Sequence, residues 1–197
     1  YDRPDLELPA HQKNLLRAVQ AANPNTVLTV VSSYPYALGE AMELLPAILY
    51  TTHAGPELGN AVADTLLGKN NPAARCPITW YRSAQDLPDI MEYDIISAER
   101  TYLYDTVEPL FPFGHGLSYS SFVYRDFTAE EKPEGMLFRL TVENTSQRDG
   151  DEVVQVYLRC MTDKEGPHYT LRAFKRVHIP AGETKQVTIP LTCESFE

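Results

Sequence analysis

The sequence predicts an α/β layered domain with parallel strands, followed by a β-sandwich of the immunoglobulin or fibronectin type. Three observations support this prediction. In the first half, segments with helical apolar spacing alternate with short, wholly apolar runs, which is typical of a parallel sheet covered by helices. In the second half, five segments have strand patterning. Polar turn sequences separate these five segments, as in an antiparallel sandwich.

The first half contains the predicted helices. Apolar residues recur at helical spacing over residues 8–22, and an Asn-Pro-Asn triplet ends that helix. The clearest helix covers residues 56–69, with an apolar stripe that includes Leu66 and Leu67 and with Gly68 as its C-terminal cap. In order, the predicted elements are a helix over 8–22, a strand over 26–33, a short helix within 37–45, a strand over 46–52, a helix over 56–69 and a short third strand over 74–80.

Residues 81–120 lack a clear secondary-structure pattern and are rich in Tyr, Pro and Asp. Because so long an irregular stretch is uncommon in a compact domain, we expect an ordered segment that wraps over the surface. Within it, Arg100, Tyr102 and Tyr104 alternate as in extended chain. This spacing predicts that all three share one face, with Arg100 paired to a carboxylate.

The stretch "EPLFPFGHGLSYSSF" (108–122) crowds aromatic rings and hydroxyls around a Gly-His-Gly turn. An active-site loop carrying His115 is one interpretation. A seam between two domains is favoured, because glycines on both sides of a histidine suit a close backbone turn. The stretch therefore predicts domains over residues 1–120 and 121–197.

The pattern of the second half predicts strands throughout. In one of them Met136, Phe138, Leu140 and Val142 alternate with polar residues, so one face is expected to be buried. Sandwiches of this type usually have about seven strands, so we expect an incomplete sandwich with an open sheet edge that allows self-association. The five candidate strands are 120–127, 136–145, 152–160, 169–179 and 184–192.

Composition excludes several classes of function. A net charge of −10 and a pI near 5.0 argue against nucleic acid or an anionic membrane as a partner. No apolar run approaches the roughly 18 residues of a spanning helix. No cofactor or metal-binding motif is present, and the triplet at Asn144 fits either a glycosylation acceptor or a turn. Three widely spaced cysteines form neither a disulfide framework nor a zinc pattern: Cys76, Cys160 and Cys193.

Polar residues follow both predicted parallel strands. Ser32 and Ser33 follow the first strand, and His53 and Glu57 follow the second. Because ligands of open α/β sheets bind at the carboxyl ends of the strands, we expect these residues to line a cleft. The alternative is that they are ordinary loop residues and that Glu57 caps the following helix.

Several segments, taken in order, resemble the C-terminal portion of glycoside hydrolase family 3, the β-glucosidase and β-xylosidase group. The resemblance covers nearly the whole chain, and its last two segments resemble that family's fibronectin type III-like domain. The matching segments are 2–33, 45–80, 86–95, 100–104, 109–122, 142–159 and 171–191.

The resemblance implies a retaining hydrolase of β-linked glucosides or xylosides, whose partners are that substrate and an N-terminal barrel domain. In the family the barrel holds an aspartate nucleophile, and the acid/base glutamate sits shortly before the "DR" pair. That pair is Asp2-Arg3 here, so both catalytic carboxylates are expected outside this chain, with Asp2 and Arg3 near the cleft. The alternative is a non-catalytic module that binds carbohydrate or protein, or a scaffold for a catalytic domain.

Overall fold

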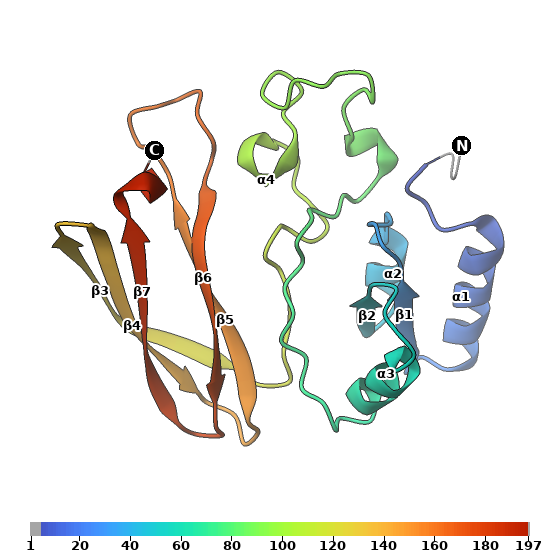
Figure 1. The fold of residues 1–197 in the computed structure, drawn as a ribbon. Coiled ribbons are helices and arrows are strands. Elements are labelled where there is room, and N and C mark those ends of the chain that lie inside the picture. Colours follow the sequence, from blue (N-terminus) through green and yellow to red (C-terminus); the bar gives the residue numbers. More distant parts are fainter. Residues whose placement is uncertain (1–4, 197) are drawn as a thin grey trace. The chain divides into compact units, whose positions relative to one another are not determined.

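The computed structural model describes residues 5–196, and Figure 1 shows their elements along the chain. These residues divide into two compact units. The first, here called the α/β unit, contains the residues up to Asn60 together with Cys76–Phe113. The second, here called the sandwich unit, contains Ala61–Arg75 and the residues from Gly114 onward. The predicted fold class, parallel α/β elements followed by a β-sandwich, is confirmed.

The first half of the chain forms three helices and two strands: α1 (Ala10–Ala22), β1 (Val27–Val31), α2 (Gly39–Leu44), β2 (Ala47–Thr51) and α3 (Leu58–Leu66). Strands β1 and β2 are parallel, and Val27 pairs with Ala47 at one end and Val31 with Thr51 at the other. The division between the two units falls inside α3. These five elements match the predicted ones.

The predicted third strand over residues 74–80 is wrong. Only Trp80 pairs there, in a single antiparallel bridge with Phe111. Pro77 has no backbone N–H to donate to a ladder, and this limits the pairing that the segment can make. The paired sheet of the α/β unit is therefore β1 and β2 alone within residues 5–196.

The apolar stripe predicted on α3 is also partly wrong. Leu66 and Leu67 are 48% and 71% exposed, whereas the buried residue of this helix is Thr65. The Thr65 hydroxyl donates to the backbone carbonyl of Ala61 at 2.9 Å. That bond satisfies the hydroxyl within the helix, so a threonine is buried there at little cost.

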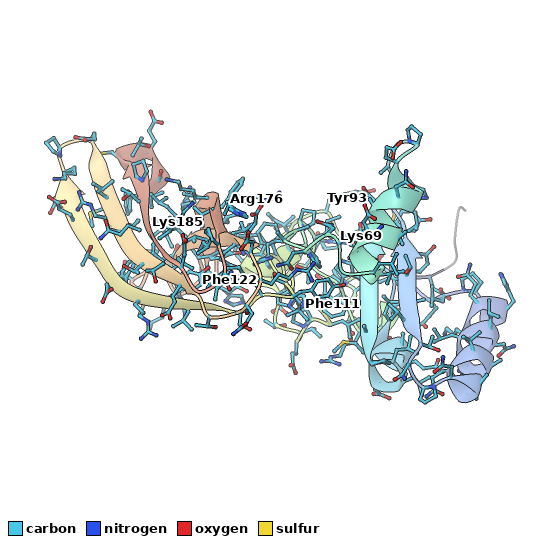
Figure 2. The ribbon with its side chains drawn as sticks, turned by 90° about the horizontal axis from the view of Figure 1, so that it is seen from below. Lys69, Tyr93, Phe111, Phe122, Arg176 and Lys185 are labelled. Atoms are coloured by element: carbon cyan, nitrogen blue, oxygen red, sulfur yellow. The ribbon has the colours of Figure 1, made fainter. Side chains whose placement is uncertain are left out.

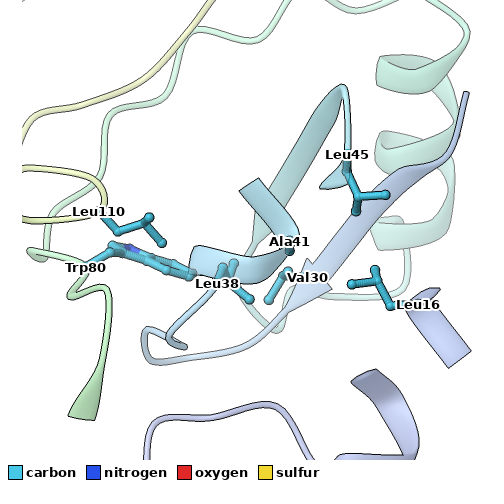
Figure 3. Packing of buried hydrophobic residues seen from close by; sticks show 7 residues of the cluster. All are labelled: Leu16, Val30, Leu38, Ala41, Leu45, Trp80 and Leu110. Carbon is cyan, nitrogen blue, oxygen red and sulfur yellow. The ribbon is translucent and has the colours of Figure 1, made fainter. Parts of the chain in front are cut away.

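The core of the α/β unit joins the strands to residues far along the chain. Trp80 is 2% exposed and Leu38 is 1% exposed. Figure 3 shows Leu38 between Trp80 and Val30. The Tyr50 ring meets the Trp80 ring edge-on, with centroids 4.7 Å apart. Trp80 thus anchors the start of the irregular segment to β2.

The irregular segment contains two short helices, η1 (Ala84–Asp86) and α4 (Thr101–Tyr104). Arg100, Tyr102 and Tyr104 therefore do not lie in extended chain, as their spacing had suggested. The Arg100 guanidinium does not pair with a carboxylate either. Its Nε and Nη2 donate to the carbonyl of Glu92 at 3.0 and 2.7 Å, and Nη2 donates to that of Asp89 at 2.5 Å. Turn carbonyls that lack helical or strand partners take the place of the predicted acid.

The sandwich unit contains five strands among residues 5–196: β3 (Phe122–Lys132), β4 (Gly135–Asn144), β5 (Gly150–Leu158), β6 (Thr170–Ile179) and β7 (Thr184–Thr192), before the short helix η2 (Cys193–Phe196). They form one sheet of order β3-β4-β7 and a second of β5-β6. Leu140 and Val142 of β4 are buried against Val154 and Ile179 of the other sheet, so the alternation predicted for β4 is confirmed. Strand β3 is an edge strand, and a register shift near Asp126 (φ 53°) interrupts it.

The Gly-His-Gly turn lies just beyond the division between the units, which falls after Phe113. Gly114 has a φ of +83°, and a Cβ on Gly116 would lie 2.1 Å from the Ala74 carbonyl oxygen. Both positions therefore require glycine. Burial, and to a lesser degree the charge of Arg75, lower the pKa of His115 between them. The turn is a close backbone contact within the sandwich unit.

Within the described residues 5–196, no helix is both long and apolar enough to cross a membrane.

Candidate functional site

The carboxyl ends of β1 and β2 meet at one edge of the sheet. The parallel register ends with Val31 beside Thr51, and the Ser32 N–H donates to the Thr51 carbonyl at 3.0 Å. The residues after each strand consequently emerge side by side. This arrangement brings Ser33 and His53 together although they are twenty residues apart in sequence.

Ser33 and His53 form the polar pair of this edge. The Ser33 Oγ lies 2.9 Å from the His53 Nδ1, and both side chains are exposed. Either atom can donate, depending on the imidazole tautomer. A hydroxyl and an imidazole together have more hydrogen-bonding positions than this one contact uses. The pair can therefore donate to and accept from a hydroxylated ligand.

Ser32 behaves differently from its neighbour. It is 3% exposed, and its hydroxyl donates to the Tyr34 carbonyl at 2.8 Å. The same oxygen accepts from the Tyr34 N–H at 3.2 Å. Its side chain shapes the turn that follows β1, which in turn places Ser33.

Glu57 lies in the turn before α3 and is exposed. Its carboxylate accepts from the Asn60 side-chain amide at 2.5 Å, while the Leu58 N–H donates to the Gly55 carbonyl. The carboxylate is therefore oriented by a side chain on the first turn of α3. Asp2 and Arg3 lie outside the described residues.

A second feature of the α/β unit was missed at the sequence level. Residues of the irregular segment, together with residues 77–79 just before it, line an open pocket of about 340 Å³ whose walls include Tyr81, Arg100, Tyr102 and Phe113. The available signal was the density of tyrosine and proline there, which had suggested only a packed surface segment. Among residues 5–196, no group of three or more His, Cys, Asp or Glu side chains is placed to hold a metal ion.

Two domain families match the chain. The "Glycosyl hydrolase family 3 C-terminal domain" matches residues 1–119, and the "Fibronectin type III-like domain" matches residues 152–197. Solved structures with the same fold include a β-glucosidase from Kluyveromyces marxianus (TM-score 0.88, 33% identity) and β-glucosidase 3B from Thermotoga neapolitana (TM-score 0.88, 28% identity). Each match covers 98% of this chain, and 24% and 30% of those chains respectively.

The curated relatives are similar over the whole chain. A xylan 1,4-β-xylosidase of Xylanibacter ruminicola is 38% identical over 198 aligned residues, covering 100% of this chain and 23% of the relative. A probable β-glucosidase J of Aspergillus fumigatus is 37% identical over 217 aligned residues, covering 97% of this chain and 25% of the relative. The chain thus spans about a quarter of the length of the curated relatives it matches. Because the family 3 C-terminal domain matches residues 1–119, more than half of the sequence, the chain belongs to glycoside hydrolase family 3.

Proposed function

We propose that this chain forms one wall of the substrate cleft in a retaining β-glycosidase that hydrolyses β-linked glucosides or xylosides. The observation that carries the proposal is the Ser33–His53 pair at the shared carboxyl edge of β1 and β2. Relatives named as a β-xylosidase and β-glucosidases give the reaction class. The hydroxyl, the imidazole and the exposed Glu57 carboxylate are groups that bind sugar hydroxyls.

The chemistry itself needs more than this wall. A retaining glycosidase places two carboxylates about 5–5.5 Å apart, one as nucleophile and one as proton donor. We assign both to residues outside this chain, the nucleophile to a barrel domain and the acid/base to a segment near Asp2 and Arg3. In this scheme Ser33, His53 and Glu57 contact the sugar, and Ser32 positions Ser33.

The first test compares the 197-residue chain with a protein extended through the parent reading frame. We expect the extended protein to hydrolyse aryl β-glucoside or aryl β-xyloside and the isolated chain to release no aryl alcohol above the buffer control. The physical reason is that neither carboxylate works without the other. Hydrolysis by the isolated chain would contradict the assignment, and Glu57 and Asp2 would then be the residues to replace.

The second test concerns the cleft wall. In the extended protein, His53→Ala is expected to lower kcat/KM by roughly 3- to 10-fold, mainly through KM, because a hydrogen bond to the substrate is lost. His11→Ala, at an exposed position of α1, is the matched control and should leave both constants unchanged. Equal kcat and KM values for the wild type and His53→Ala would contradict the proposal that His53 lines the cleft.

A further inference from the structure

The pocket in the irregular segment has the composition of a small-molecule site. Its volume of about 340 Å³ lies at the lower end of the range for such sites, about 300–1,000 Å³. Apolar and aromatic side chains dominate its walls, and one charged residue of the described chain lines it. The residues that carry the argument are Ile78, Leu87, Arg100, Thr101, Tyr102 and Phe113.

One wall is flat. The rings of Tyr102 and Phe113 stack with centroids 4.2 Å apart and an angle of 8° between their planes. A stacked pair has little rotational freedom, so the wall is already formed before any ligand arrives. Ile78 and Leu87, with two prolines, add to the apolar lining. Such a surface suits a planar ring, which gains both apolar burial and ring contact there.

The charged group is held in place by the backbone. Two nitrogens of the Arg100 guanidinium, Nε and Nη2, donate the three hydrogen bonds to the carbonyls of Asp89 and Glu92. These bonds leave Nη1 available. No salt bridge to Arg100 occurs among residues 5–196. The guanidinium is therefore fixed in position while its positive charge is not paired with an acid.

The backbone on both sides of Arg100 is strained. Glu99 and Thr101 have φ values of 49° and 65°. A β-branched residue such as threonine rarely adopts this conformation. Strain of this kind persists where the surroundings fix it, and it is concentrated at ligand sites. Thr101 itself lines the pocket next to Arg100, and its hydroxyl oxygen accepts from the Leu103 N–H at 3.3 Å, which leaves the hydroxyl hydrogen to donate.

We propose that this pocket binds a small aromatic carboxylate. The ring of the ligand lies against Tyr102 and Leu87. The carboxylate of the ligand accepts from the Arg100 Nη1 and from the Thr101 hydroxyl. The volume suits one six-membered ring with a short acidic side chain. This site uses none of the strand-edge residues, so the inference does not depend on the proposed hydrolytic function.

The test is a titration of the 197-residue chain with cinnamate, followed by amide NMR shifts and by the fluorescence of Trp80, which lies between two pocket-lining residues in sequence. We expect saturable binding, with shifts confined to residues 77–113. Cinnamyl alcohol, which has the same ring without the charge, should bind about tenfold more weakly. Absence of saturation at millimolar cinnamate, or equal affinity for the alcohol, would overturn the proposal.

Variants separate the pocket from the surrounding surface. Tyr102→Leu is expected to weaken cinnamate binding about tenfold through loss of the ring contact. Tyr93→Leu is the matched control: this tyrosine is 79% exposed on the same segment, labelled in Figure 2, and does not line the pocket. Thr101→Val keeps the branched shape without the hydroxyl, and it supplies the test if Tyr102→Leu does not fold. Equal weakening by Tyr93→Leu would place binding elsewhere.

Discussion

Replacing Asn144 by aspartate is expected to lower the free energy of unfolding by about 3–5 kcal/mol, because it leaves an uncompensated charge in a buried site. Asn144 is 0% exposed at the end of β4. Its Nδ2 donates to the carbonyls of Arg148 at 2.7 Å and Ile179 at 3.0 Å. Its Oδ1 accepts from the Ser146 N–H at 3.0 Å. Aspartate has the same shape, but at neutral pH it has no donor and directs a negative charge at two carbonyl oxygens.

Urea denaturation at pH 7 measures this loss. Gln147→Glu is the matched control, because it makes the same amide-to-acid change at an exposed position of the same turn. We expect the control to change stability by less than about 0.5 kcal/mol. Comparable midpoints for Asn144→Asp and Gln147→Glu would show that the buried amide contributes little.

The same geometry decides between the two interpretations of the Asn-Thr-Ser triplet. Glycosylation requires an accessible side-chain amide, whereas the Asn144 amide is buried and its nitrogen already donates twice. In the folded chain the triplet is a turn that ties β4 to the end of β6. Sequence alone left both interpretations open, because the pattern records which residues are adjacent and not which side chain is buried.

Local periodicity predicted the parts of the fold that depend on local burial. The alternation through Leu140 and Val142 identified β4, and the apolar runs identified β1 and β2. The order of strand and polar loop also predicted that Ser33 and His53 would share an edge. Whether these residues line a sugar cleft stays a prediction that the kinetic test above addresses.

The side-chain contacts that the sequence did not predict have a different physical origin. The Arg100 guanidinium binds carbonyls that turns bring within reach, and no pattern along the chain reveals where those carbonyls point. Ser32 and Ser33 are neighbours of the same type, yet one hydroxyl bonds to the following turn and the other meets His53. Sequence predicts that such loops are polar. It does not predict which of two adjacent hydroxyls is buried.

The second large effect is expected from the buried ion pair of the sandwich unit. The Arg75 Nη2 donates to the Glu152 Oε2 at 2.7 Å, and the two side chains are only 13% and 11% exposed. The Tyr124 hydroxyl donates to the other carboxylate oxygen at 2.7 Å. Burial, and then this contact with Glu152, raise the pKa of Tyr124 well above its usual range. The carboxylate therefore has a donor on each oxygen, but among residues 5–196 only Arg75 bonds to it with a positive charge.

Arg75→Met is consequently expected to lower the free energy of unfolding by about 3–5 kcal/mol, since it leaves the Glu152 charge buried without a countercharge. Arg75→Met combined with Glu152→Leu should cost less than Arg75→Met alone, because the double variant removes the stranded charge together with its partner. The exposed pair Arg125–Glu143, with side chains 57% and 32% exposed, provides the control. Arg125→Met should cost no more than about 1 kcal/mol, as surface ion pairs are largely solvated. If the double variant were less stable than Arg75→Met, then Glu152 would stabilise the sandwich through Tyr124 rather than through its charge pair.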